Sequence, residues 1–348
     1  MSRATELLTT AEEAATHLRS AEAAKWLDQL DGIYSECEWA LGWLIDHDRT
    51  DEALRLALAL VDFWQFADRI GDGRDWLDRV LLARSVEDAS HAEALFQAGL
   101  LAFWQGDDAV ARDLHQRSLE IASRLSDPTG VALARTGLAR IELRTDIGRA
   151  QALSLEALDA VSRTNDQRGR SNALHLLGAA AQMTADFPEA RDWMLRRLEL
   201  AHAMGDLRTV AAESGNLSMV ERQLGNLTRA RELADHALQL ADRLGDSWMI
   251  PYCLNGLAAI ALATGHHERA ATLLSAADHL VRDQGAAWPP DEAPHFEHTR
   301  TTTAQALSPK TFNQAWSTGH SLTPTEAVTY ALSPLEGESA LVPEPGRG

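Results

Sequence analysis

The chain has 348 residues, 45% of them hydrophobic, so it can bury a sizeable core and is expected to fold. Its 51 acidic residues outnumber the 32 basic ones, which gives a formal net charge of −19. Because such a surface repels phosphate groups, we expect no direct binding to nucleic acid or to an anionic membrane.

Residues 1–90 are interpreted as a divergent helical cap. Residues 1–20 are polar and lack the apolar core of a signal peptide, and the chain has only two cysteines. We therefore expect a cytoplasmic protein without a disulfide framework. Residues 26–83 keep a helical period without a regular repeat, and they predict three helices, the last of which contains Gly73.

A repeat of about 40 residues dominates residues 91–286. Steps of 39, 40, 40 and 40 residues separate the alanines that open five similar helices: Ala111, Ala150, Ala190, Ala230 and Ala270. After Ala230, leucines and alanines recur every three or four positions while charged residues fill the other face, which predicts an amphipathic helix. A fixed period in this range indicates a solenoid, so we predict an all-α fold of five helix pairs.

The punctuation between the helices agrees with this interpretation. Gly-Asp pairs at 106–107, 205–206 and 245–246 supply a glycine that can end one helix and an aspartate that can cap the next. The alternation of apolar and polar residues that indicates strands is absent from the sequence. Because one helix pair cannot bury its apolar stripe alone, neighbouring pairs must stack.

The repeat ends at the prolines of "GAAWPPDEAPHF", and residues 287–333 are expected to form a short helical cap. Three helices should begin near Asp291, at Ser308-Pro309 and at Thr323-Pro324, because a hydroxyl before a first-turn proline is a helix-start signal. The tail, residues 334–348, is rich in Pro, Gly and Glu and has no period, so it is expected to be disordered.

The pattern G-D-x-x-x-A-R-x-x-x-x-x-x-L-x-x-A resembles the tetratricopeptide repeat in a longer, forty-residue form. The stretches "WALGWLIDHDRTDEALRLALALVDFWQFADRIGDGRDWLDRVL" and "FNQAWSTGHSLTPTEAVTYAL" are similar to the two ends of the repeat region in bacterial LuxR-type and AfsR-type regulators, the MalT-like group. The likeness covers about residues 15–333 and implies a right-handed α-solenoid of tetratricopeptide-like helix pairs.

In that family an ATP-hydrolysing module normally precedes the repeats, and a DNA-binding helix-turn-helix often flanks them. The present sequence contains no G-x-x-x-x-G-K-[ST] motif. The resemblance therefore implies either the repeat region of a longer regulator or a stand-alone relative.

In tetratricopeptide arrays the first helix of each pair lines a concave groove, so the resemblance also implies where a ligand would bind. Counting back 13, 10, 6 and 3 positions from each turn selects one column per first helix; the second repeat is short, so its frame can shift by one. The candidate groove residues are Glu93, Phe96, Phe103, Arg135, Glu142, Asn172, His175, Gln182, Met219, Arg222, Tyr252 and Asn255. An apolar concavity with a few polar groups is typical of ligand sites. The alternatives are a solvated inner surface and a groove filled by the C-terminal helices.

Glu221 occupies an offset that normally holds an apolar residue. A buried carboxylate needs a partner, so Arg222, Arg135 or a hydroxyl should pair with it. The simpler expectation is a local rotation of the helix that exposes Glu221 to solvent.

No catalytic residue, cofactor or metal is predicted. The histidines of "GHHE" and "HFEH" lack the spacing and the third ligand of a zinc site, and no nucleophile turn or dinucleotide loop occurs. Trp104, Trp193 and Trp248 are expected to cover seams between repeats.

The sequence favours a non-enzymatic binding domain: the ligand-sensing or protein-docking arm of a LuxR/AfsR-type regulator, or a stand-alone relative. Its groove would take a peptide, a protein helix or a small effector, and homo-oligomerisation is left open. One alternative is an enzyme of secondary metabolism that uses the concavity as a reaction chamber, with His175, Glu142 or Arg222 as acid–base groups. A structural assembly scaffold is a third.

Overall fold

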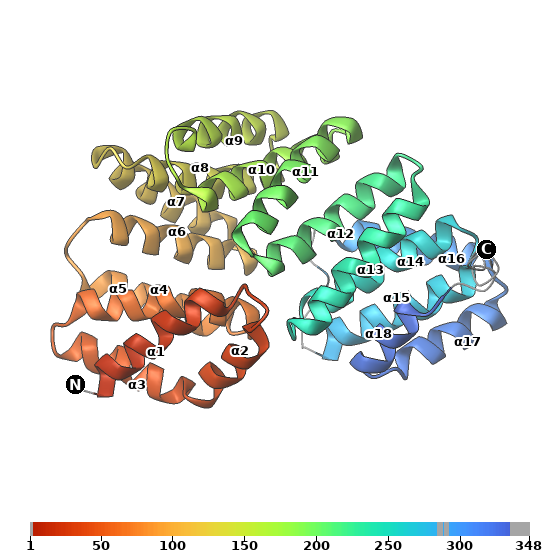
Figure 1. Cartoon of the computed structure of the whole chain (residues 1–348), viewed down its shortest axis with the longest axis horizontal. Coiled ribbons are helices and arrows are strands. Elements are labelled where there is room, and N and C mark those ends of the chain that lie inside the picture. Colours follow the sequence, from red (N-terminus) through yellow and green to blue (C-terminus); the bar gives the residue numbers. More distant parts are fainter. Residues whose placement is uncertain (1–2, 284–287, 289–291, 335–348) are drawn as a thin grey trace, which may run out of the picture.

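The computed structural model describes residues 3–283, 288 and 292–334, and every regular element among them is an α-helix (Figure 1). The predicted all-α solenoid is confirmed. None of the described helices is both long enough and apolar enough to cross a membrane.

The helices fall into three groups along the chain. The N-terminal group is α1 (Arg3–His17), α2 (Ala23–Gly32), α3 (Tyr34–Asp46), α4 (Thr50–Phe66) and α5 (Ile70–Ala83). Five pairs follow: α6 (Ala89–Trp104) with α7 (Asp108–Arg124), α8 (Pro128–Glu142) with α9 (Ile147–Val161), α10 (Gln167–Met183) with α11 (Phe187–Met204), α12 (Leu207–Gln223) with α13 (Leu227–Arg243), and α14 (Met249–Ala263) with α15 (His267–Asp283). The C-terminal group is α16 (Ala293–Ala306), α17 (Pro309–His320) and α18 (Pro324–Leu332).

Short turns with a recurring chemistry join the helices. One side-chain oxygen of each capping aspartate accepts a hydrogen bond from a backbone N–H in the first turn of the next helix: Asp107, Asp127, Asp146, Asp166, Asp186 and Asp206. The glycines that end helices with a positive φ, which glycine adopts without strain, are Gly106, Gly205, Gly225, Gly245 and Gly265. The Gly-Asp signals in the sequence therefore mark real helix boundaries.

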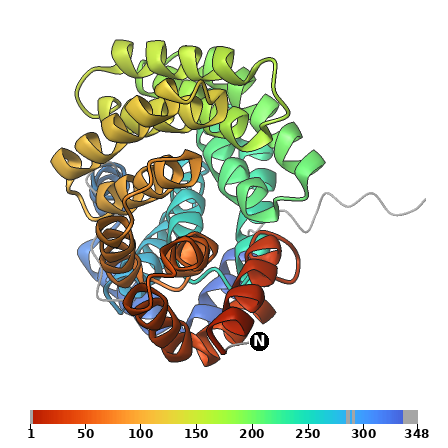
Figure 2. The same ribbon diagram turned by 90° about the vertical axis from the view of Figure 1, so that its left-hand side faces the viewer.

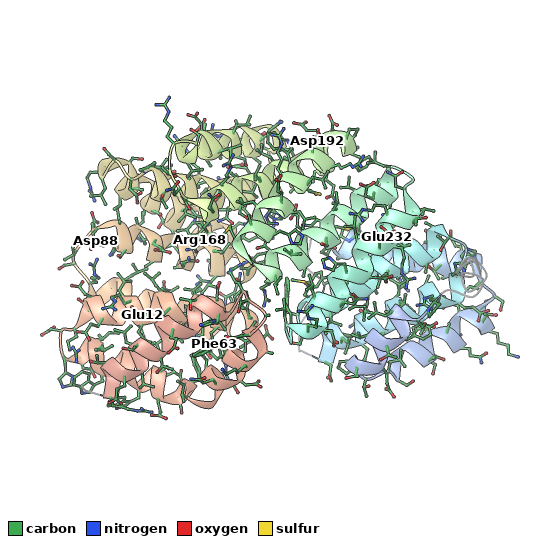
Figure 3. All side chains as sticks on the ribbon, in the orientation of Figure 1. Glu12, Phe63, Asp88, Arg168, Asp192 and Glu232 are labelled. Atoms are coloured by element: carbon green, nitrogen blue, oxygen red, sulfur yellow. The ribbon has the colours of Figure 1, made fainter. Side chains whose placement is uncertain are left out.

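The pairs wind round a central axis, with first helices inside and second helices outside (Figure 2). The alanines that opened the repeat, from Ala111 to Ala270, have no exposed surface. Charged residues of the second helices, such as Asp192 of α11 and Glu232 of α13, lie on the outer surface (Figure 3). This arrangement is the one that an amphipathic second helix requires.

The first two pairs approach closely because two glycines face one ring. A Cβ on Gly99 of α6 would lie 2.7 Å from the His115 ring of α7, and a Cβ on Gly137 of α8 would collide with the same ring. His115 is fully buried, and neither ring nitrogen has a hydrogen-bond partner in the described part of the chain. The planar ring therefore sets the spacing of α6, α7 and α8.

The N-terminal group contains more helices than the sequence predicted. Three were expected within residues 26–83, but α2 to α5 occupy that region, and the polar segment before it forms α1. The apolar side of α1, which includes Leu7 and Leu8, is buried against α3 and α4. Only Ile33 separates α2 from α3, and a break of one residue carries little signal in a sequence.

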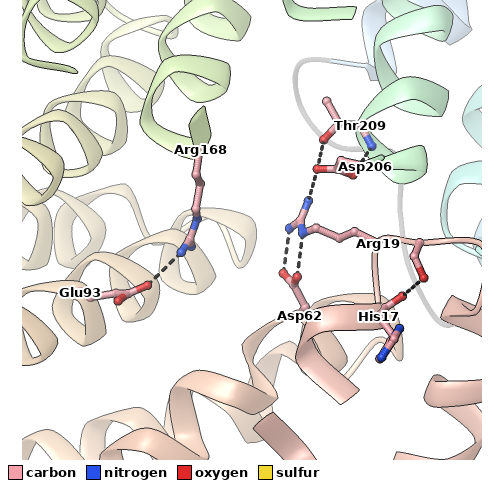
Figure 4. A network of polar contacts seen from close by, with 8 residues as sticks. His17, Arg19, Asp62, Glu93, Arg168, Asp206 and Thr209 are labelled. Carbon is pink, nitrogen blue, oxygen red and sulfur yellow. Dashed lines mark hydrogen bonds and ion pairs between the residues drawn. The ribbon is translucent and has the colours of Figure 1, made fainter. Parts of the chain in front are cut away.

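The N-terminal helices also close the superhelix against the fourth pair. Arg19, which follows α1, donates two hydrogen bonds of 2.7 and 2.8 Å to Asp62 of α4 and lies 3.5 Å from Asp206, the N-cap of α12 (Figure 4). The backbone N–H of Leu207 donates to the Arg19 carbonyl at 2.9 Å. These contacts hold together segments almost two hundred residues apart.

A second closing contact reaches the fifth pair. The Arg208 guanidinium of α12 lies 3.2 Å from the centre of the Phe66 ring at the end of α4, and 2.7 Å from Asp246 before α14. Asp246 is fully buried, and this burial raises the pKa of its carboxyl although the charge of Arg208 opposes the shift. Arg208 thus joins α4, α12 and α14.

The C-terminal helices α17 and α18 begin where the sequence predicted. Ser308 and Thr323 cap them, each accepting a backbone hydrogen bond, with a proline in the first turn. Arg231 of α13 and Arg269 of α15 donate hydrogen bonds of 2.8 Å to the Ala331 carbonyl at the end of α18, which satisfies a carbonyl that the helix leaves unpaired. Asp291, the expected start of α16, and residues 335–348 of the predicted disordered tail lie outside the described residues.

We expect Gly137→Ala to destabilise the protein by about 1–3 kcal/mol, because the methyl group overpacks against a buried ring. Gly256→Ala in α14 is the matched control: a Cβ there meets no atom within 4 Å, so helix propensity should make it neutral or stabilising by up to about 1 kcal/mol. Urea unfolding of both variants measures the difference. Equal effects would contradict the role of the His115 ring.

Stability should also fall on acidification, through His115. Burial, together with the smaller effect of the Arg140 charge, lowers the pKa of His115 from 6.5 to about 3. Between these values the unfolded chain binds a proton that the folded chain does not, so stabilisation present above the unfolded pKa is lost as the pH falls towards the folded one. The free energy of unfolding changes by at most about 1.4 kcal/mol per pH unit through this one group.

His115→Phe keeps a planar ring without a titrating group, so it should flatten this part of the stability curve. Urea midpoints of the two proteins over the acidic range provide the measurement. An unchanged slope would show that other groups cause the acid sensitivity.

Candidate ligand-binding face

The first helices of the last three pairs each leave one stripe of residues partly exposed. The stripes are Asn172, His175, Ala179 and Gln182 on α10, Ala212, Gly215, Met219 and Arg222 on α12, and Tyr252, Ala259 and Leu262 on α14. Their spacing of three, four or seven residues keeps each stripe on one side of its helix. Together these residues form a surface, called the inner face below, on the columns that the sequence analysis selected.

The second pair keeps the spacing of the first. The N-caps of α8 and α9, Asp127 and Asp146, each lie 39 residues after the N-caps of α6 and α7. Arg135 and Glu142, the candidate residues of α8, are partly exposed.

Arg135 and Glu142 of α8 both have partners on neighbouring helices. The Nε atom of Arg135 lies 3.3 Å from Glu156 of α9. Glu142 pairs with Arg112 of α7 and accepts a hydrogen bond of 2.9 Å from the Thr145 hydroxyl, and the hydrogen bond from Arg112 lowers the pKa of the Glu142 carboxyl. Arg135 thus contacts the second helix of its own pair, and Glu142 contacts the second helix of the preceding pair.

The two phenylalanines of α6 are core residues. Phe96 and Phe103 are 3% and 4% exposed, too little to offer a ligand an aromatic surface. The Phe96 ring lies 5.4 Å from the His115 ring, and the Arg144 guanidinium lies 4.0 Å from the centre of the Phe103 ring. Phe96 and Phe103, which were candidate groove residues, therefore pack inside the core.

A chain of aromatic rings links α6 to α14. Trp104, which is 37% exposed, meets Trp248 edge-on at 6.1 Å, and Trp248 lies 4.6 Å from Tyr252. Tyr252 in turn meets Trp288 at 5.5 Å, measured between ring centres. The sequence analysis assigned Trp104 and Trp248 to seams because both lie near helix ends. Their contact across the superhelix joins pairs that are distant in sequence.

His175 belongs to a polar network in the seam between α10, α11 and α12. Its Nδ1 atom lies 3.3 Å from Nη1 of Arg197 and 3.8 Å from Oε2 of Glu213. Arg197 also pairs with Glu213 and donates a hydrogen bond of 3.2 Å to Ser171. The His175 side chain is 24% exposed, so it still reaches the inner face.

The network sets the protonation of its members. Burial raises the pKa of Glu213, but the Arg197 charge and the His175 contact outweigh it, and the net pKa is lowered. Burial lowers the pKa of His175 to about 4, and the Arg197 charge adds to this shift. At neutral pH the network is therefore a Glu213–Arg197 ion pair beside a neutral imidazole.

Several predicted groove residues have polar groups without partners. Within the described residues, Asn172, Gln182 and Arg222 have no side-chain hydrogen bond or ion pair, and Met219 completes the stripe of α12. Burial lowers the pKa of Arg222. Asn255 is buried, and its Oδ1 atom has no hydrogen-bond partner among the residues that the structure describes. Glu93 is different, because it accepts a hydrogen bond of 2.9 Å from Arg168 of α10 (Figure 4).

The expectation of an exposed Glu221 is wrong. Glu221 is 2% exposed, lies 2.9 Å from the Nε atom of Arg191 on α11, and accepts a hydrogen bond of 2.6 Å from Asn226. The partner comes from the preceding pair, so neither Arg222 nor Arg135 is needed to balance the buried charge.

The inner face does not assemble the acid–base pair of the enzyme alternative. His175 contacts Arg197 and Glu213, whereas Glu142 contacts Arg112 and Thr145. Among the described residues, no group of three or more histidine, cysteine or acidic side chains could hold a metal ion.

No protein-family model matches the chain. Curated proteins that it resembles include predicted HTH-type transcriptional regulators of Mycobacterium tuberculosis and Mycobacterium bovis, which are 25% identical to it over 216 residues. The matched residues cover 60% of this chain and 24% of each relative, so the chain spans about a quarter of the relatives' length.

Solved structures share the architecture at low sequence identity. A Rap protein complexed with competence and sporulation factor has a TM-score of 0.60 and 14% identity, covering 90% of this chain and 85% of that one. A STAND ATPase with a tetratricopeptide repeat sensor from Pyrococcus horikoshii has a TM-score of 0.54 and 12% identity, covering 91% and 49%. At these identities the likeness establishes the fold alone, a tetratricopeptide-like solenoid.

Glu213→Ala should destabilise the protein by about 3–5 kcal/mol, because it leaves the Arg197 charge buried and unpaired. His175→Ala removes a partly exposed neutral ring and should cost only about 1 kcal/mol. Urea unfolding of the two variants checks this order. If both cost the same, His175 is a core residue and is not available to a ligand.

Proposed function

We propose that this chain is a non-enzymatic binding domain that takes a peptide on its inner face. In this proposal it is the ligand-sensing arm of a LuxR/AfsR-type transcriptional regulator, or of a stand-alone relative of that group. The observation that carries the proposal is a set of partly exposed polar side chains, Asn172 and Gln182 of α10 and Arg222 of α12, that have no hydrogen-bond or ion-pair partner among the described residues.

An extended peptide matches this chemistry. Its backbone offers N–H donors and carbonyl acceptors in turn, and the amides of Asn172 and Gln182 each contain both a donor and an acceptor. Met219, Ala259 and Leu262 supply apolar contact area beside them. A surface built on helices of this kind binds without the cost of ordering its own loops.

Arg222 adds a preference for a negative group. Its guanidinium is half-buried, its pKa is lowered by burial, and no carboxylate of the described residues balances its charge. A peptide carboxylate would restore the interactions that burial removes, and hydrogen bonds to charged groups are stronger than neutral ones. We therefore place the acidic side chain or C-terminal carboxylate of the peptide at Arg222.

The relatives support the regulatory part of the proposal. The similar mycobacterial proteins are predicted HTH-type transcriptional regulators, and the similar STAND ATPase has a tetratricopeptide repeat sensor. The formal charge of −19 disfavours contact between this chain and DNA, so DNA binding would be the task of another part of such a regulator. Because the similar mycobacterial proteins are predicted transcriptional regulators, we also propose a cytoplasmic location for this chain.

A pool of random octapeptides with free carboxylates, incubated with the protein and analysed by mass spectrometry after removal of unbound peptide, tests this function. We expect retention of a defined subset that contains an acidic group. Arg222→Ala should weaken binding of those peptides by about ten- to a hundredfold, the usual loss for a hydrogen bond to a charged group.

Arg229→Ala on α13 is the matched control, because Arg229 is exposed on the outer surface and pairs with Glu232. It should leave retention unchanged. Retention of no peptide, or equal retention by the Arg222→Ala variant, would contradict the proposal.

A further inference from the structure

A cavity of about 480 Å³ opens on the outer side of the third pair, away from the inner face. It is called the outer pocket below, and its lining residues are Leu158, Val161 and Ser162 from the end of α9, Gln167, Arg170 and Leu174 from α10, and Trp193, Arg196, Glu199, Leu200 and Ala203 from α11. Its volume falls in the range of small-molecule sites.

The floor of the outer pocket is apolar. Val161 and Leu174 are 3% and 4% exposed. The partly exposed Leu158, Leu200 and Trp193 extend this apolar surface towards the rim. Five apolar side chains around one hollow favour a ligand with a hydrocarbon or aromatic body.

The rim of the outer pocket is positive. Arg170 and Arg196 both line it. Neither guanidinium has a carboxylate of the described residues within 4.0 Å, the distance limit for an ion pair. Arg196 instead stacks 4.7 Å from the centre of the Trp193 ring. One carboxylate, Glu199, also lines the pocket, so two positive charges oppose one negative charge.

The missing carboxylate partners distinguish this place from the rest of α11. Arg191 lies 2.9 Å from Glu221, and Arg197 pairs with Glu213, so the two neighbouring arginines of the helix have acidic partners.

We propose that the outer pocket binds a small amphiphilic monocarboxylate, such as a medium-chain fatty acid or an aryl-alkanoic acid. The carboxylate pairs with Arg170 and Arg196, whose planar guanidinium groups suit this anion. The apolar body covers Leu174, Leu200 and the Trp193 ring. The site is separate from the inner face, and the inference does not depend on the proposed peptide function.

Isothermal titration calorimetry with three probes that each carry a ten-carbon chain tests the inference on the full chain. The probes are decanoate, decanol and decyltrimethylammonium, each below its micelle concentration. We expect one decanoate to bind per chain, at least tenfold more tightly than decanol, with no saturable binding of the cation. Equal binding of decanoate and the cation, or no saturable binding of decanoate, overturns the proposal.

Two variants locate the site. The double variant Arg170→Gln/Arg196→Gln should weaken decanoate binding at least tenfold. The control is Arg163→Gln, which should not change binding, because Arg163 is exposed in the turn between α9 and α10 and does not line the pocket. Ala203→Trp should fill the exposed rim and also block binding. Decanoate binding that survives both pocket variants lies elsewhere and overturns the assignment. Arg222→Ala should leave decanoate binding intact, which separates this result from the test of the inner face.

Discussion

No helix pair in this chain can bury its apolar stripe by itself, and the rest of the structure follows from this constraint. Each pair covers its neighbour, and the small residues at the contacts decide how close the helices come. Ala150, Ala190 and Ala230 have no exposed surface, and a single ring, His115, fills the space between Gly99 and Gly137. A stack of this kind must end, so both ends of the chain provide helices that complete it.

The N-terminal helices do more than cover the first pair. Arg19 reaches Asp62 and Asp206, and Arg208 reaches Phe66, so the start of the chain contacts the fourth pair across the axis. The C-terminal end is held by Arg231 and Arg269, which bind the last carbonyls of α18. The hydrogen bonds and ion pairs of these arginines are directional, whereas apolar packing is not. They therefore fix how tightly the superhelix closes.

The helix α10 has a central position in both proposals. Asn172, His175 and Gln182 lie on its inner side, whereas Arg170 and Leu174 line the outer pocket on its other side. Between the two surfaces runs the seam with Arg197 and Glu213, which is buried and charged.

The sequence by itself determined the class of fold, the forty-residue period, the capped turns and the starts of α17 and α18, because each depends on residues close together in the chain. It also predicted one candidate column on each first helix, and most residues of the columns of α10, α12 and α14 are partly exposed. Only the tertiary structure decided the partner of Glu221, the contact of Trp104 with Trp248 and the closure by Arg19. These contacts join residues that are distant in sequence, and the curvature of the whole stack determines which of them meet.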